Sequence, residues 1–208
     1  MPRPPMPRRT MPLRLRAALL LLAMTLALGL WVHVAGTPGF DAPLSRVLAP
    51  LRATPGLWQA ASFAGDWQVR LAIGGGAAAS LAARGRRAAA LVLLTTAAAQ
   101  TLATSGLKLL YARPRPTMFD HLDRITDLSF PSGHAAQNAC LWLLIALLLD
   151  RRLLALGGPL ILMIGVSRVV LGVHWPSDVL GGWLFGAACA LIGADVARRL
   201  PDMRKDRP

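Results

Sequence analysis

Three ionisable residues interrupt an apolar stretch near the end of the chain. The stretch reads SRVVLGVHWPSDVLGG, and it contains Arg168, His174 and Asp178. Ionisable side chains in a segment apolar enough for a membrane are costly, and they usually mark a functional site. Asp178 follows His174 by four residues, so one helical turn would bring the carboxylate to the imidazole. A carboxylate on one ring nitrogen fixes the tautomer and leaves the other nitrogen free to attack.

Two further cations precede this stretch. Lys108 and Arg115 lie seven residues apart in the segment KLLYARPRP. The planar fork of arginine suits phosphate or carboxylate oxygens, and lysine adds a point charge. Together with Arg168 they predict a site that binds an anion.

The stretch PSGH supplies the remaining chemistry. Ser132, Gly133 and His134 stand where a new apolar run begins. Ser132 could cap a helix starting there, and the backbone N–H groups of a helix start, with Gly133 allowing close approach, form an anion cradle. A second histidine permits acid–base chemistry near neutral pH. A nucleophile, its orienting carboxylate, an acid–base histidine and an oxyanion clamp together describe phosphoryl transfer without a metal.

The composition indicates a membrane protein. Of the 208 residues 54% are hydrophobic, the mean hydropathy is +0.48 and the net charge is +13. In a soluble protein such basicity would suggest nucleic acid, but here the basic residues form short clusters between apolar runs, which is typical of membrane topology. We therefore expect no nucleic-acid partner. Cys140 and Cys189 lie inside apolar runs and are interpreted as small packing residues rather than a disulfide or a zinc site.

Six apolar runs approach the roughly 20 residues that a membrane-spanning helix needs. We therefore predict an all-α polytopic membrane protein with six transmembrane helices. The second run is the weakest, although its small residues (GGGAAAS) favour close helix contacts in membranes. The first run could instead be a cleaved signal peptide, but it is longer than a usual signal core. The runs cover about 17–36, 66–83, 88–111, 133–149, 153–173 and 179–196.

The basic clusters give an orientation. With six spans, the leader 1–16, the loop 84–87, the turn 150–152 and the tail 199–208 all fall on one side, and they carry most of the lysines and arginines. The positive-inside rule makes that side cytoplasmic. We expect a cytoplasmic leader, a membrane domain over 17–198 and a cytoplasmic tail, in the cytoplasmic (inner) membrane.

We expect the candidate site residues on the opposite side of the membrane, which is periplasmic or extracellular. The segment 112–132 and the turn around His174 reach this same face, together with a loop over 37–65, so the candidate site residues can converge there. Arg113 is interpreted as a solvated interface arginine, with an extra contact to a lipid head group as the alternative. A solvated interpretation, with substrate gating as the alternative, is also given to the connecting-loop residues Asp120, His121, Asp123, Arg124 and Asp127.

The three motifs occur in one order and at one set of spacings. Lys108 and Arg115 fit KxxxxxxRP, PSGH ends at His134, and the last stretch fits SRxxxxxHxxxD with His174 and Asp178. Each alone has a structural interpretation, such as a helix cap for Asp178. Together the chain resembles the type 2 phosphatidic acid phosphatase superfamily, which also includes vanadium haloperoxidases, and no motif position departs from the pattern.

The resemblance implies a role for each matched residue. His174 would attack phosphorus to form a phosphohistidine, Asp178 would orient His174, and His134 would protonate the leaving group and then help to activate water. No metal or other cofactor is expected. The phosphoryl oxygens would be held by Lys108, Arg115, Ser132, Gly133 and Arg168.

The resulting expectation is an integral membrane phosphatase acting on a lipid phosphate or diphosphate. Family members with this layout act on undecaprenyl diphosphate, phosphatidylglycerophosphate and phosphatidic acid. The sequence leaves open which lipid it is and in what oligomeric state the chain works. Two alternatives share the same residues: a vanadate-dependent haloperoxidase, and a membrane transporter or binder of lipids or anions.

Overall fold

The computed structural model describes residues 11–201, and within that range the chain forms helices joined by turns and loops, with no β-strand. The predicted all-α class is therefore confirmed for these residues. Residues 1–10 of the predicted leader and 202–208 of the predicted tail lie outside the described range.

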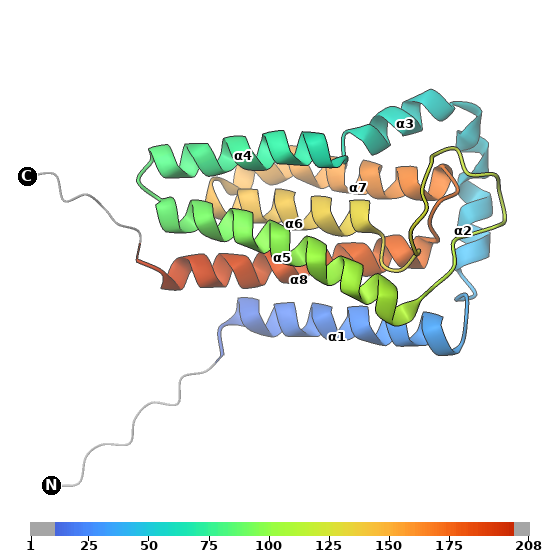
Figure 1. The fold of residues 1–208 in the computed structure, drawn as a ribbon, viewed down its shortest axis with the longest axis horizontal. Helices are drawn as coiled ribbons and strands as arrows, with labels where there is room; N and C mark the ends of the chain where they lie inside the picture. The colour runs from blue at the N-terminus through green and yellow to red at the C-terminus, as the bar shows by residue number, and fades with distance from the viewer. Residues whose placement is uncertain (1–10, 202–208) are drawn as a thin grey trace, which may run out of the picture.

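Six long helices lie side by side as a bundle (Figure 1). Each coincides with one of the predicted apolar runs to within a few residues. They are α1 (Leu13–Val34), α4 (Trp67–Ala83), α5 (Arg87–Tyr111), α6 (Gly133–Leu148), α7 (Leu154–Val170) and α8 (Pro176–Arg199).

The segment 37–65 is mostly helical, so the prediction of a loop there is wrong. It contains α2 (Asp41–Leu48), the 3-10 helix η1 (Ala49–Ala53) and α3 (Pro55–Phe63). Pro55 stands at the first position of α3, where its missing N–H costs nothing. These short elements cover one end of the bundle, beside the loop between α5 and α6 (Figure 1).

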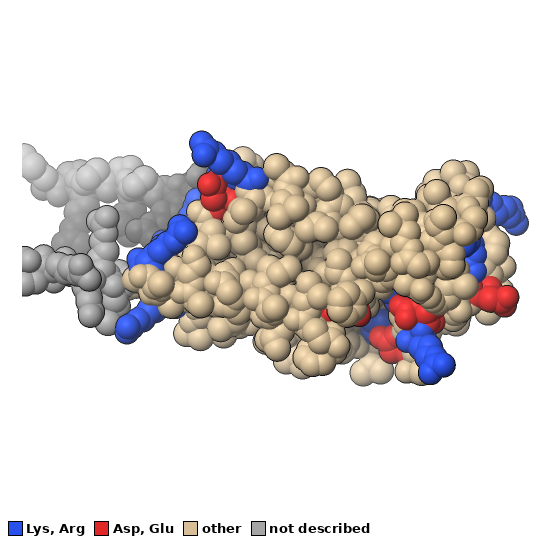
Figure 2. Space-filling model, turned by 90° about the horizontal axis from the view of Figure 1, so that it is seen from above, with Lys and Arg blue, Asp and Glu red and all other residues tan. Residues whose placement is uncertain are grey.

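Within residues 11–201, four helices are long and apolar enough to cross a membrane, which confirms the membrane character and four of the six predicted spans. These four are α1, α5, α8 and α7 together with η2 (Arg151–Leu153) before it. The α6 helix is apolar but has 16 residues, and α4 has 17. On the face drawn in Figure 2, lysine, arginine and aspartate side chains gather toward the two ends of the molecule and leave an uncharged belt between them.

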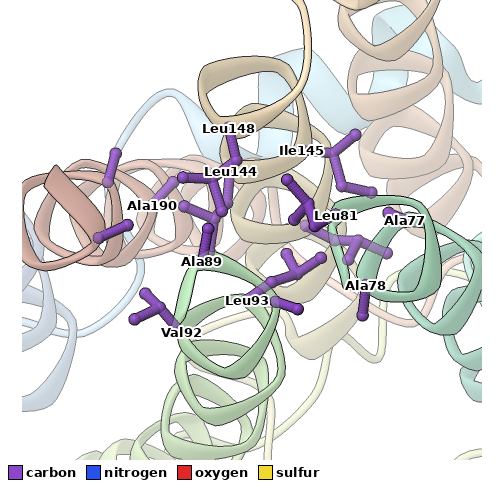
Figure 3. Packing of buried hydrophobic residues seen from close by; sticks show 14 residues of the cluster. Ala77, Ala78, Leu81, Ala89, Val92, Leu93, Leu144, Ile145, Leu148 and Ala190 are labelled. Atoms are coloured by element: carbon purple, nitrogen blue, oxygen red, sulfur yellow. The ribbon is translucent and has the colours of Figure 1, made fainter. Parts of the chain in front are cut away.

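The core lies around α6, which packs against α5, α7 and α8. Leu81, Leu93, Leu144 and Ile145 belong to its largest apolar cluster (Figure 3). The contact between α6 and α8 is close, because a Cβ atom at Gly186 would overlap the carbonyl oxygen of an α6 residue. The two helices whose first turns carry His134 and Asp178 are therefore held firmly against each other.

Candidate active site

The predicted site residues meet at the end of the bundle capped by α2 and α3. The loop 112–132, the turn 171–175 and the first turns of α6 and α8 all lie there (Figure 1). The ends of the described chain, at the start of α1 and the end of α8, lie at the opposite end.

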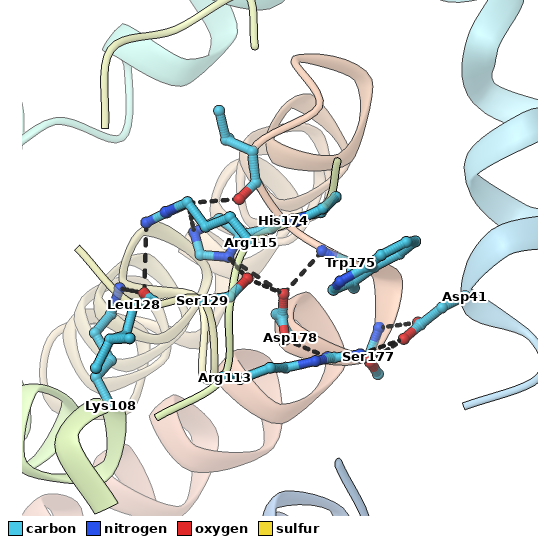
Figure 4. Close-up of polar contacts among 12 residues, drawn as sticks. Asp41, Lys108, Arg113, Arg115, Leu128, Ser129, His174, Trp175, Ser177 and Asp178 are labelled. Carbon is cyan, nitrogen blue, oxygen red and sulfur yellow. Dashed lines mark hydrogen bonds and ion pairs between the residues drawn. The ribbon is translucent and has the colours of Figure 1, made fainter. Parts of the chain in front are cut away.

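His174 lies between a carboxylate and a cation. Its Nδ1 is 3.5 Å from Oδ2 of Asp178, and its Nε2 is 3.3 Å from Nη1 of Arg115 (Figure 4). The same Asp178 oxygen accepts hydrogen bonds from the Ser129 hydroxyl at 2.5 Å and the Trp175 backbone N–H at 2.8 Å. The Trp175 bond caps α8, so Asp178 fixes the start of that helix while it faces the imidazole.

The surroundings of His174 keep its ring neutral. Burial, followed by the positive charges of Arg115 and Lys108, lowers the pKa of His174 well below the ordinary value of 6.5. A neutral imidazole with Nδ1 toward Asp178 has its lone pair on Nε2, which faces the Arg115 guanidinium. This is the arrangement that a nitrogen nucleophile needs in order to meet an anionic substrate held by arginine.

Lys108 and Arg115 share one carboxylate. Nζ of Lys108, in the last turn of α5, lies 2.5 Å from Oδ2 of Asp127 and 2.6 Å from the carbonyl oxygen of Leu128. Arg115 bonds the other Asp127 oxygen and the carbonyl oxygen of Val173. The interpretation of Asp127 as a solvated loop charge is therefore incomplete, because the exposed carboxylate also pairs with these two cations.

Arg168 is fully buried near the end of α7. Its Nη1 lies 2.7 Å from Oδ2 of Asp123 and also donates to the hydroxyl of Ser62. The prediction of a solvated Asp123 is likewise incomplete, because this partly exposed carboxylate pairs with Arg168. Nε and Nη2 of Arg168 are buried and find no acceptor among residues 11–201. Unpaired buried donors are costly, so this guanidinium is prepared to bind an acceptor that the described chain does not supply.

The PSGH segment begins α6 as expected, but Ser132 does not cap it. Ser132 stands at the N-cap position, its N–H donates to the carbonyl oxygen of Asp178 at 2.9 Å, and its hydroxyl makes no capping bond. That hydroxyl is also buried without a partner among the described residues. Gly133 is the first helical residue, and a side chain there would meet nothing within 4 Å. Space and unpaired polar groups therefore coincide at this helix start.

His134 has a partner that the sequence did not indicate. Its Nε2 is 2.7 Å from Oδ1 of Asp66, the residue just before α4. Burial raises the pKa of Asp66, and the positive charge of Arg168 opposes that rise. Asn138, one turn further along α6, donates to the carbonyl oxygen of Gly65 at 3.0 Å, which holds α4 and α6 in register. His134 is thus oriented by a carboxylate, as His174 is.

The interpretation of Arg113 as a solvated interface residue is wrong. Its side chain is 4% exposed and forms ion pairs with Asp178 and Asp41. Asp41 lies 72 residues away along the chain, in a helix that was expected to be a loop. The three motifs do not include Arg113, and only the fold reveals its partners.

A family comparison agrees with this geometry. Residues 89–201 match the model of the PAP2 superfamily, which is more than half of the chain. The chain therefore belongs to the PAP2 superfamily, as the three motifs had indicated.

Curated relatives are named as phosphatases of several phosphorylated lipids. Phosphatidylglycerophosphatase B of Bacillus subtilis is 38% identical over 90 residues, which cover 38% of this chain and 44% of the relative. Undecaprenyl-diphosphatase of Sulfolobus acidocaldarius is 35% identical over 71 residues, 34% of each chain. The lipid A 1-phosphatase of Rhizobium johnstonii is 41% identical over 71 residues, 34% of this chain and 29% of the relative. The chain thus matches less than half of the length of these relatives.

Solved structures share the fold over a longer range. The crystal structure of a transmembrane PAP2-type phosphatidylglycerolphosphate phosphatase from Bacillus subtilis superposes with a TM-score of 0.77 at 24% identity, covering 90% of this chain and 99% of that one. The structure of Aquifex aeolicus LpxE gives a TM-score of 0.60 at 21% identity, with coverage of 76% and 96%. The bundle is therefore that of a PAP2 membrane protein.

Proposed function

We propose that this protein is an integral membrane phosphatase that hydrolyses a phosphate monoester or diphosphate on a lipid. The observation that carries the proposal is the set of unpaired buried donors on Arg168 and Ser132 beside a neutral His174. A phosphoryl group supplies the acceptor oxygens that these donors lack and an electrophile for the imidazole. The names of the curated relatives support the same class of reaction.

The first step transfers the phosphoryl group to the protein. Nε2 of His174 attacks phosphorus, the bond from phosphorus to the lipid oxygen breaks, and His134 gives that oxygen a proton. Asp178 stabilises the positive charge that develops on the His174 ring. The phosphoryl oxygens are held by the cations Lys108, Arg115 and Arg168, the Ser132 hydroxyl and the Gly133 backbone.

The second step releases phosphate. His134 takes a proton from water, the water oxygen attacks phosphorus, and the bond between phosphorus and Nε2 breaks. Asp66, 2.7 Å from Nε2 of His134, stabilises the protonated form of this histidine in both steps. No step in this scheme needs a metal or another cofactor.

A cavity beside the site has the character of a lipid-tail site. It has a volume of about 530 Å³ and lies between α4, α5 and α6. Trp67, adjacent to Asp66, and Gln137, three residues after His134, line it together with apolar residues such as Leu94. A lipid whose head group reaches His134 could place the first part of its acyl or prenyl chain in this cavity, within the uncharged belt of the molecule.

The proposed topology follows from the charges. The membrane domain over 17–198 would cross the cytoplasmic (inner) membrane six times, with α4 and α6 as short packed spans. Both termini would be cytoplasmic and the site would face the periplasmic or extracellular side, where the head group of an outer-leaflet lipid lies. The bilayer and the lipid phosphate are then its partners.

Phosphate release by the purified protein in EDTA tests the proposal. The substrates are undecaprenyl diphosphate, phosphatidylglycerophosphate and phosphatidic acid, and wild type is compared with His174→Ala. His121→Ala is the matched control, because this loop histidine bonds only the carbonyl oxygen of Pro116 among the described residues. We expect His174→Ala to lose nearly all turnover and the control to retain it.

A phosphoenzyme labelled from radioactive substrate provides the second readout. Acid-labile label should appear in wild type and be absent from His174→Ala. Equal phosphate release by wild type and His174→Ala would refute His174 as the nucleophile. Bromide oxidation on adding vanadate, with no phosphate release, would support the haloperoxidase alternative instead.

A further inference from the structure

A buried arginine joins three elements behind the candidate nucleophile. Nη1 of Arg113 bonds Oδ1 of Asp178 and lies 2.7 Å from the hydroxyl of Ser177, while Nη2 lies 2.8 Å from Oδ2 of Asp41 (Figure 4). These groups come from α2, from the residues after α5 and from the first turn of α8. Both carboxylates are fully buried.

Asp41 uses both of its oxygens in this network. Oδ1 accepts the backbone N–H of Ser177 at 2.8 Å, and Oδ2 accepts the hydroxyl of Ser177 at 2.6 Å as well as Arg113. Asp41 therefore holds the first turn of α8 and neutralises Arg113 at the same time. The cation that Asp41 and Asp178 share is Arg113, and without it two buried carboxylates would lie near each other uncompensated, which is unfavourable.

The two oxygens of Asp178 are divided between two tasks. Oδ1 faces Arg113, whereas Oδ2 accepts from Ser129 and Trp175 and faces Nδ1 of His174. A carboxylate that lost Arg113 could rotate, and Oδ2 would then leave the imidazole. The orientation of His174 thus depends on the charge of Arg113, which acts through Asp178.

We propose that Arg113 and Asp41 are positioning residues for the phosphatase reaction. Arg113 pairs with Asp178 and fixes its rotation, and Asp41 keeps Arg113 in place from α2. The proposal rests on the proposed function, because it matters to turnover only if His174 is the nucleophile. It also gives α2, a helix that is outside the three motifs, a direct connection to the reacting imidazole.

A purely structural ion pair is the competing explanation. Such a pair would tie α2 to α8 and affect thermal stability, with no selective effect on the chemical step. A positioning pair must instead lower kcat and the rate of phosphoenzyme formation while leaving KM unchanged, since neither Arg113 nor Asp41 belongs to the proposed phosphate clamp.

The test compares Arg113→Lys, Arg113→Met and Asp41→Asn with wild type in the lipid phosphatase assay. Ser45→Ala is the matched control, because Ser45 is buried in the same helix as Asp41 but, within residues 11–201, its hydroxyl bonds only the backbone oxygen of Asp41. We expect kcat to fall roughly 10- to 100-fold in Arg113→Met and Asp41→Asn, because a misplacement of about 1 Å at a reacting group costs on the order of 100-fold. Arg113→Lys keeps the charge and should recover part of that loss.

KM should change less than about twofold in the same variants, and the double variant Arg113→Lys/Asp41→Asn should lose less than the product of the two single losses. Wild-type kcat in Arg113→Met and Asp41→Asn, or a fall in melting temperature alone, would overturn the proposal. If Arg113→Lys does not fold, the kcat of the isosteric variant Asp41→Asn alone tests the positioning role. An inactive wild type would instead refute the proposed function, so the two failures are distinguishable.

Discussion

Asp127→Asn removes a carboxylate that competes with the substrate for its cations. Asp127 lies 2.5 Å from Nζ of Lys108 and bonds Arg115 through its other oxygen. Burial alone would raise the pKa of Asp127, but the hydrogen bonds and charges of Lys108 and Arg115 lower it below the ordinary value. The carboxylate is therefore ionised at neutral pH, and a phosphoryl group must displace it to reach both cations.

The exposure of Asp127 determines how large a change in KM is expected from Asp127→Asn. Its side chain is 56% exposed, so each ion pair is worth the roughly 0.2–1 kcal/mol of a solvated pair rather than the larger energy of a buried one. Loss of two such pairs would favour substrate binding by roughly 0.4–2 kcal/mol, which corresponds to a fall in KM of roughly 2- to 30-fold. Asp127 does not contact His174, so kcat should change little.

The assay measures phosphate release against lipid concentration in mixed micelles, together with inhibition by orthovanadate, which needs no lipid tail. Asp120→Asn is the control, because Asp120 belongs to the same loop and its carboxylate forms no ion pair within residues 11–201. Both KM and the vanadate inhibition constant should fall in Asp127→Asn. A higher KM would refute the reasoning, since Asp127 would then organise the cations for substrate instead of competing with it.

Three further outcomes follow from the site and the core. Asp66→Asn should lower kcat roughly 10- to 100-fold, because His134 loses the carboxylate that it bonds. The loss should be larger on substrates with poor leaving groups. Equal losses on good and poor leaving groups would argue against a role of His134 as the acid. Because the pKa of His174 is lowered in the folded state, His174 takes up a proton near pH 6.5 in the unfolded chain but stays neutral at that pH in the folded chain. The free energy of unfolding is therefore unaffected by the protonation of His174 above pH 6.5 and falls below it by up to about 1.4 kcal/mol per pH unit. His174→Asn should flatten the resulting fall in melting temperature between pH 6.5 and 5. Gly186→Ala should destabilise the bundle by about 1–3 kcal/mol, whereas Gly106→Ala, with open space around its Cβ position, should leave the melting temperature unchanged.

The long helices were predictable because their signal is local. An apolar run of sufficient length indicates a span whatever its neighbours are, and all six runs became helices. The short helices over 41–63 have no such signal. They are held by distant contacts, such as the bonds from Arg52 to the carbonyl oxygens of Val170 and Asp120, which no local pattern reports.

The same division applies to the site. The approach of Asp178 to His174 was predicted from their spacing of four residues, although His174 lies in the turn before α8 and only Asp178 lies in the helix. The partners of His134 and Lys108 were not, since Asp66 and Asp127 reach them across 68 and 19 residues of chain. Residue type alone does not tell a solvated charge from a buried one; that depends on how the loop folds back.

Burial divides the carboxylates of the site into two groups with opposite expected effects. Asp41 and Asp178 are fully buried, whereas the side chains of Asp66, Asp123 and Asp127 are 36%, 34% and 56% exposed. A buried carboxylate cannot leave its cation without stranding a charge, so it fixes geometry, and its loss should reduce kcat. A solvated carboxylate can exchange its cation for water at little cost, so a phosphoryl group can displace it, and the loss of Asp123 or Asp127 should reduce KM. Asp66 is the informative exception, because its partner is a histidine and not a clamp cation. Asp66→Asn should reduce kcat although Asp66 is as exposed as Asp123. This result would show that the identity of the carboxylate's partner, and not its burial, decides whether kcat or KM changes.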